Sequence, residues 1–132
     1  MRLFALLMLC TAAPAFATDQ FDLACQGTRI VKSGGPSEPT SLKVHVDLAA
    51  KRWCTDACAR VLPIVDATAD KITLRDDVTL NTSAERNYEV TFNRKTNAYH
   101  EFLYQVRPTE DYLKIEATCT AAAFTPFPAP KP

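Results

Sequence analysis

Leu42-Lys43-Val44-His45-Val46-Asp47-Leu48 is the stretch that decides the fold. Apolar and polar residues alternate through it without a break, which is typical of a β-strand with one buried face and one solvated face. His45 falls on the polar face, so we expect its side chain to be exposed. The period of two residues, not the helical 3.6, recurs along the rest of the chain.

The same alternation marks six further segments. They are residues 21–25, 72–74, 78–80, 87–92, 100–106 and 113–119. In the fifth, the apolar face is assigned to His100, Phe102, Tyr104 and Val106. No window shows a sustained helical stripe. The pattern therefore predicts an all-β domain, a small antiparallel β-barrel or sandwich with meander connections and seven to eight strands.

Turn chemistry supports this assignment. Residues 47–53 and 93–99 each begin with Asp or Asn and end with an aromatic residue. Each fits a tight hairpin with a positive φ angle at Lys51 or Asn97. The acidic pairs at 76–77 and 110–111 are interpreted as solvated turns between strands.

Two segments look irregular by composition. Residues 33–41 contain two glycines and two prolines and are expected to form a loop. Residues 125–132 carry a proline at every second position, so they cannot donate a regular ladder of hydrogen bonds. We therefore predict a β domain over 18–124, followed by a disordered proline-rich tail.

The beginning of the chain has the layout of a secretory signal peptide. Arg2 precedes a short apolar run, and Ala15-Phe16-Ala17 supplies an A-x-A cleavage site. We expect cleavage near Thr18 and export to the periplasm or the exterior. Leu9 before Cys10 disfavours a lipoprotein. The apolar run is too short for a retained anchor, so no membrane span should remain after cleavage.

Charge balance excludes some classes of partner. Without Arg2, the chain has 14 basic and 15 acidic residues, and they are interspersed. Nucleic-acid binding needs clustered Lys and Arg, so it is disfavoured. Binding to a membrane surface is disfavoured for the same reason.

Four cysteines remain after cleavage and allow three connectivities. Cys25 and Cys119 continue the apolar faces of the first and last strands. Strand phase therefore favours a Cys25–Cys119 bond together with a local Cys54–Cys58 bond. A redox pair or a metal site at Cys54-x3-Cys58 is disfavoured, because neither the spacing nor the fold matches those motifs. No metal or cofactor is expected.

No catalytic motif is present. The catalytic alternative is a small periplasmic hydrolase that uses His45 or His100 with carboxylates from other strands. Glu101 cannot orient His100 locally, because neighbouring strand residues point to opposite faces. For binding, Trp53, Tyr99 and Tyr112 form the candidate ligand surface, since the two tyrosines are out of phase with their apolar neighbours. Cross-strand stabilisation of the sheet is the competing role for these aromatic residues.

Three groups of short motifs resemble a known set of proteins. They are Phe21-x-Leu23-x-Cys25-x-Gly27, Val46-Asp47-Leu48 followed by Arg52-Trp53-Cys54, and Asn93-Arg94-x-Thr96 ending in Tyr99. Together they resemble uncharacterised small exported proteins of sphingomonad-type alphaproteobacteria. The resemblance implies a periplasmic location and carries no known activity. It departs at Asn97, where glycine would be expected.

The sequence thus predicts a general class of function and no specific partner. We expect a non-enzymatic binding or interaction module of the cell envelope, whose partner is an envelope protein or a small molecule. The hydrolase is the alternative.

Overall fold

The computed structural model describes residues 18–130, so the expected leader at 1–17, with Cys10, lies outside the described residues. The described chain contains no helix, and hence none that could cross a membrane. Its strands are β1 (Gln20–Ile30), β2 (Glu38–Asp47), β3 (Arg52–Thr55), β4 (Leu62–Pro63), β5 (Asp66–Ala67), β6 (Lys71–Leu80), β7 (Glu85–Asn93), β8 (Ala98–Arg107) and β9 (Asp111–Ala122).

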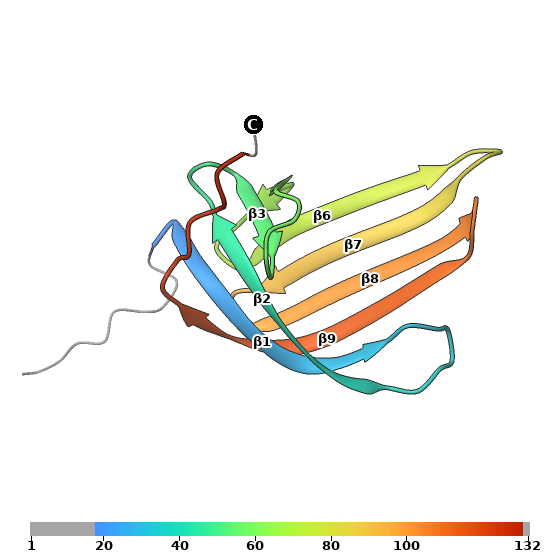
Figure 1. The fold of residues 1–132 in the computed structure, drawn as a ribbon, viewed down its shortest axis with the longest axis horizontal. Helices are drawn as coiled ribbons and strands as arrows, with labels where there is room; N and C mark the ends of the chain where they lie inside the picture. Colours follow the sequence, from blue (N-terminus) through green and yellow to red (C-terminus); the bar gives the residue numbers. More distant parts are fainter. Residues whose placement is uncertain (1–17, 131–132) are drawn as a thin grey trace, which may run out of the picture.

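All nine strands belong to one antiparallel sheet in the order β4-β3-β2-β1-β9-β8-β7-β6-β5. The sheet curls into a half-barrel (Figure 1). The prediction of an all-β antiparallel fold is confirmed. The strand count is slightly higher than predicted, because β3, β4 and β5 are short segments that the alternation did not reveal.

The two edges of the half-barrel are joined by the chain itself. β4 and β5 are the outermost strands of the sheet, yet only Ile64 and Val65 separate them in sequence. Ile64 N donates to Lys51 O (2.9 Å) and Val65 N donates to Thr73 O (3.0 Å). The curl is therefore held at this end of the molecule, whereas the distal halves of β6–β9 diverge from it (Figure 1).

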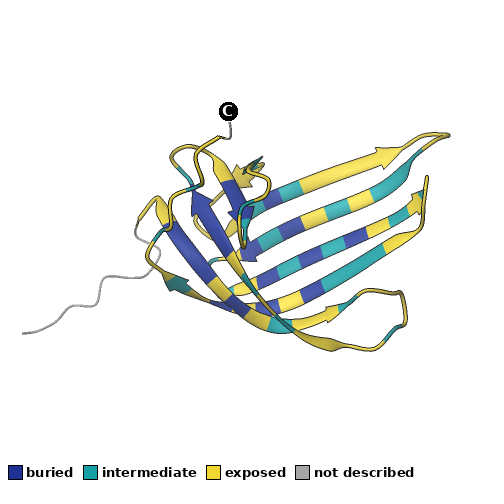
Figure 2. Ribbon diagram, in the orientation of Figure 1, coloured by how far each residue is buried: buried dark blue, intermediate teal, exposed yellow. Residues whose placement is uncertain are grey.

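The hydrophobic core fills the end where the edges meet. Buried residues concentrate there, while the distal part of β6 is exposed and that of β7 is half-buried or exposed (Figure 2). The core consists of inward-facing side chains from both halves of the sheet: Phe21, Leu23, Cys25, Val44, Val46, Trp53, Ile72, Leu74, Val90, Phe92, Tyr99, Ile115, Ala117 and Cys119. The predicted inward faces of β1, β2, β7 and β9 are confirmed.

Both hairpin predictions are confirmed in detail. Lys51 and Asn97 have φ angles of 55° and 60°. The residue that opens each turn accepts backbone hydrogen bonds with its side chain. Asp47 Oδ1 accepts from Ala50 N (2.9 Å), and Asn93 Oδ1 accepts from Lys95 N and Thr96 N (2.9 and 3.0 Å).

The predicted inward face of β8 is wrong. Tyr99, Glu101 and Leu103 are buried, whereas the alternate residues His100, Phe102 and Tyr104 are half-buried or exposed. Glu101 lies in the middle of the buried face, so the polar residue of the sequence pattern falls on the inner side and the apolar face was assigned to the wrong residues. Burial of Glu101 is tolerated because two tyrosine hydroxyl groups donate to it.

The predicted turn at Asp76-Asp77 is also wrong, because residues 72–74 and 78–80 belong to one strand, β6. The register against β7 shifts between Thr73 and Arg75, which is a β-bulge with Leu74 as the extra residue. A bulge reverses the faces of all later residues relative to a regular strand. Val78, opposite Asn87, and Leu80 therefore lie on the outer face of β6 and are exposed.

Two disulfides cross-link the chain, as predicted. Cys25 and Cys119 are directly opposite in the β1–β9 register and form a bond with S–S 2.05 Å. Cys54 and Cys58 form the local bond after β3.

Candidate functional site

The concave side of the half-barrel contains a cavity of about 410 Å³. We refer to this cavity as the trough. It lies beside the core, between β1–β3 on one side and β6–β9 on the other. Its walls are Arg29, Thr40, Ser41, Leu42, Trp53, Cys54, Thr55, Asp56, Ala59, Arg60, Leu62, Arg75, Tyr88, Glu101 and Ile115. Every long strand of the sheet contributes to it.

The bulge in β6 places Arg75 in the trough. Arg75 pairs with Val90, whose side chain is in the core, so the register shift turns Arg75 toward the concave side. Its guanidinium carbon lies 4.0 Å from the centroid of the Tyr88 ring, in a cation–π contact. Arg75 Nε also donates to Asp77, on the same face of β6. Two contacts thus fix this cation at the wall.

Glu101 lies at the base of the trough, between two tyrosines. Tyr88 Oη donates to Glu101 Oε1, and Tyr99 Oη donates to Glu101 Oε2 (2.7 Å). Burial raises the pKa of both phenols, and the adjacent Glu101 carboxylate raises the pKa of each further. Both tyrosines therefore stay protonated as donors, and both oxygens of the carboxylate have partners.

Trp53 leaves a donor without an acceptor in the same wall. Its side chain is 4% exposed, and its Nε1 has no hydrogen-bond partner within residues 18–130. Indole nitrogen can only donate, and a buried donor without an acceptor costs about 1–3 kcal/mol. Such groups are rare in folded proteins, and this nitrogen has almost no accessible surface, so it lies behind the wall and does not border the open space of the trough.

The predicted ligand surface of Trp53, Tyr99 and Tyr112 is not a single exposed surface. Tyr99 is in the core at 1% exposure. Tyr112 is half-buried on the convex face, where it makes an edge-to-face contact with Phe102 (centroids 5.8 Å apart). Of the three, only Trp53 lines the trough. Sequence reasoning missed Arg75 and Glu101, although an acidic residue inside a strand rich in aromatic residues could have pointed to Glu101.

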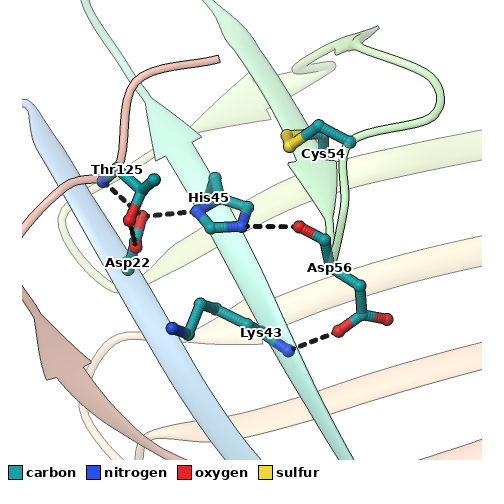
Figure 3. Close-up of a disulfide and its surroundings, with 7 residues drawn as sticks. Asp22, Lys43, His45, Cys54, Asp56 and Thr125 are labelled. Carbon is teal, nitrogen blue, oxygen red and sulfur yellow. Dashed lines mark hydrogen bonds and ion pairs between the residues drawn. A yellow bond between two sulfur atoms is a disulfide. The ribbon is translucent and has the colours of Figure 1, made fainter. Parts of the chain in front are cut away.

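The expectation that His45 is exposed is wrong, because its side chain is buried on the outer face of β2 (Figure 3). His45 Nδ1 is 2.8 Å from Asp22 Oδ1, and Nε2 is 2.9 Å from the carbonyl oxygen of Asp56. Asp22 also accepts from Thr125 N (3.1 Å) and Thr125 Oγ1 (2.6 Å). The network connects four segments of the chain, namely β1, β2, the turn after β3 and the tail.

This network also positions the start of the proline-rich tail. Residues 123–130 have no regular secondary structure, in line with their composition. Thr125 is nevertheless bound to Asp22, and the Arg52 guanidinium lies 5.3 Å from the centroid of the Phe127 ring. The tail therefore packs on the domain at these two residues, which its proline content did not reveal.

Neither histidine is arranged for general-base chemistry. A carbonyl oxygen only accepts, so His45 Nε2 donates to Asp56, and the other ring nitrogen is taken by Asp22. His100 is on the convex face, with Nδ1 3.9 Å from Glu116 Oε1, and the two side chains are 38% and 60% exposed. Among the described residues, no cluster of three His, Cys, Asp or Glu side chains could hold a metal ion.

Comparison with known proteins gives no further guide to the site. No protein-family model matches this chain, and neither a curated protein nor a solved structure does.

Proposed function

We propose that this chain is an exported, non-enzymatic binding module of the cell envelope, and that its ligand is a small molecule held in the trough. Export is supported by the layout of residues 1–17, and two disulfides suit an oxidising compartment such as the periplasm.

One observation carries the binding proposal: the trough combines a suitable volume with a wall of apolar and polar side chains. Small-molecule sites typically measure about 300–1,000 Å³, with apolar walls and a few polar groups that orient the ligand. At about 410 Å³, the trough falls in this range.

The hydrolase alternative rests on the 2.8 Å contact between His45 and Asp22. That distance suits a catalytic pair, but a general base needs a free nitrogen directed at the substrate. Here the second nitrogen is bound to the Asp56 carbonyl oxygen, and the ring is 4% exposed. The geometry supports a structural role for this pair better than a catalytic one.

Trp53 provides the test, because it is the single tryptophan of the chain and lies in the trough wall. The mature protein, unfolded and refolded to remove bound molecules, is titrated with a small-molecule extract of the envelope. Tryptophan fluorescence and native mass spectrometry report occupancy. We expect a saturable change in fluorescence together with a discrete mass adduct.

Variants that fill the trough provide the control. Thr40→Phe and Leu42→Phe add bulk to the wall and should abolish both signals. Lys43→Phe adds a ring of the same size to the opposite face of β2 and should leave them unchanged. Retained thermal unfolding midpoints show that the variants fold. A wild-type protein that gives neither signal, or equal signals from all three variants, contradicts a ligand in the trough.

A further inference from the structure

The two long strands nearest the ends of the sheet differ in how their free edges are covered. β3 pairs with residues 44–47 of β2, and β5 pairs with residues 66–67 against 72–73 of β6, so the rest of each long strand is an edge. At the β2 edge, Asp56 N donates to Lys43 O (2.8 Å) and Lys43 N donates to Asp56 Oδ1 (3.0 Å). Further along this edge, a proline at position 39 has no N–H to offer. The β2 edge is therefore blocked to an added strand.

The distal half of β6 has no such cover. Residues 76–80, which we refer to as the β6 edge, pair with β7 on one side only, and each of them is exposed. Hydrogen-bonded and non-hydrogen-bonded pairs alternate along an antiparallel ladder. Asn81 N donates to Ala84 O (2.8 Å) at the hairpin, so the residues at 76, 78 and 80 direct their N–H and C=O groups away from β7. These groups have no strand partner within the described chain.

The side chains of the same three residues lie on the outer face of the sheet. Val78 and Leu80 are 71% and 76% exposed, more than any other large hydrophobic residue of the described chain. Proteins usually protect an open edge by keeping it short, bulged, charged or covered. Here the bulge lies before the β6 edge, and two apolar side chains stand beside the free backbone groups. The edge thus offers both the hydrogen bonds and the apolar contacts that an added strand uses.

Charge determines which kind of strand fits. Asp76 lies directly opposite Glu89, and like charges across a strand pair repel each other. Neither carboxylate forms an ion pair within residues 18–130, whereas Asp77 on the other face is paired with Arg75. A second copy of this chain would bring the same two acidic groups to the edge. A Lys or Arg from a different strand would instead meet both carboxylates.

We propose that the β6 edge binds an extended segment of another protein as an added antiparallel strand, with apolar side chains opposite Val78 and Leu80 and a Lys or Arg opposite Asp76. Backbone hydrogen bonds provide the affinity of such a complex, and the alternate side chains provide its specificity. This surface is separate from the trough, because the three side chains are on the outer face and the trough is on the concave side.

The test uses synthetic peptides with blocked ends. The probe is Ser-Val-Thr-Val-Thr-Lys-Ser, whose valines and lysine share one face when it is extended. Its binding to the mature protein is followed by NMR as slowed hydrogen exchange of backbone amides. The amides of residues 76, 78 and 80 should be protected, whereas those of Asp77 and Thr79, which already face β7, should change less.

Backbone methylation of the peptide tests for strand addition. Methyl groups on the nitrogens of the two valines and the lysine remove the donors that would face β6, so they should abolish the protection. Methyl groups on the threonine nitrogens modify the opposite edge of the same peptide and should leave the protection in place.

Charge exchange tests the partner's chemistry. Replacing the lysine of the peptide by glutamate should weaken binding at least about threefold, because an attractive cross-strand pair becomes a repulsive one. Asp76→Lys should abolish or reverse this preference. Asp19→Lys makes the same change of charge just before β1, away from the β6 edge, and should preserve it (Figure 1). Native circular dichroism shows that both variants fold.

Three results would overturn the proposal. The first is no protection of the three amides, or protection that survives methylation of the valines and lysine. The second is equal binding of the lysine and glutamate peptides. The third is a wild-type protein that sediments as a dimer with these amides already protected, because the occupant is then a second copy. A ligand in the trough is tested separately and stands or falls on its own experiment.

Discussion

At the scale of single residues, Asp47 should make the stability of the domain depend on acid. Burial alone would raise the pKa of Asp47, but hydrogen bonds from Ala50 N and Gln20 Nε2, with the charge of Arg52, hold this pKa below its ordinary value of 3.8. A lowered pKa stabilises the fold at pH values above 3.8, and this contribution is lost as the pH falls through the folded-state pKa.

Asn93 opens the matching hairpin without a charge, so the two turns form a matched pair. Asp47→Ala and Asn93→Ala should each cost about 1–2 kcal/mol at pH 7, because each removes hydrogen bonds to turn backbone. Urea denaturation at pH 7 and pH 2.5 measures both costs. The cost of Asp47→Ala should shrink in acid, whereas that of Asn93→Ala should not. Equal costs of Asp47→Ala at the two pH values would contradict the role of its charge.

Tyr88 and Tyr99 should resist ionisation for as long as the domain is folded. Burial and the adjacent Glu101 raise the pKa of both phenols. Their contribution to stability is therefore complete below about pH 10, the ordinary tyrosine value, and is lost as the pH rises further.

Absorbance at 295 nm checks this in folded and urea-unfolded protein at pH 11. Tyr88→Phe and Tyr99→Phe should each match the folded wild type in phenolate absorbance. After unfolding, each should lack one of the four tyrosine contributions. A variant with lower absorbance while its circular dichroism is still native would show that the phenol had ionised in the folded state.

Glu101 and His45 also show where residue-level prediction ends. Each sits on a face whose burial depends on partners 13 to 23 positions away, Tyr88 for Glu101 and Asp22 for His45. Alternation assigns a polar residue to the solvated face by default. It cannot detect that a distant hydroxyl or carboxylate will satisfy the group inside. The chemistry of both networks was therefore missed, although the strands that carry them were predicted.

At the scale of elements, Gly27 controls the close approach of β1 and β9. It is opposite Ala117, two residues from the Cys25–Cys119 bond. A Cβ at position 27 would overlap the carbonyl oxygen of Glu116 and lie 2.8 Å from Ala117 Cβ. We expect Gly27→Ala to destabilise the domain by about 2–3 kcal/mol in urea denaturation, because the backbone of β9 must move.

Gly34 provides the comparison, because it has open space around it but a φ angle of 70°. Gly34→Ala should cost only about 1 kcal/mol, from backbone strain alone. If the two substitutions cost the same, close packing of β1 on β9 is not what requires Gly27.

Strands and hairpins of this chain could be predicted, but the bulge could not. The positive φ angles at Lys51 and Asn97 follow from local spacing that the sequence contains. The bulge at Leu74 depends on the register against β7, which the local sequence does not contain. The acidic pair that follows it in the sequence was interpreted as a turn between two strands. Because this bulge directs Arg75 into the trough, the missed element is also the one that builds part of the site.

At the scale of the whole molecule, strand phase predicted that the first and last strands pair through Cys25 and Cys119. It could not predict how the opposite edges meet, because β4 and β5 are two residues each and carry no pattern. The trough exists because the half-barrel is held by Ile64 and Val65 at one end only. Its volume therefore depends on how the two halves of the sheet curl toward each other, which no single strand encodes.

The two disulfides should contribute unequally to the free energy of unfolding, because they close loops of different length. In the chain-entropy model, closing the 94-residue separation of Cys25 and Cys119 contributes about 4–5 kcal/mol, whereas the four-residue separation of Cys54 and Cys58 contributes about 2 kcal/mol. Paired Cys→Ser substitutions, followed by urea denaturation, measure each bond separately. A domain of this size typically has only about 5–15 kcal/mol of stability, so losing the long-range bond should leave the fold marginal. An equal or reversed order would mean that β1 and β9 hold together without their covalent link.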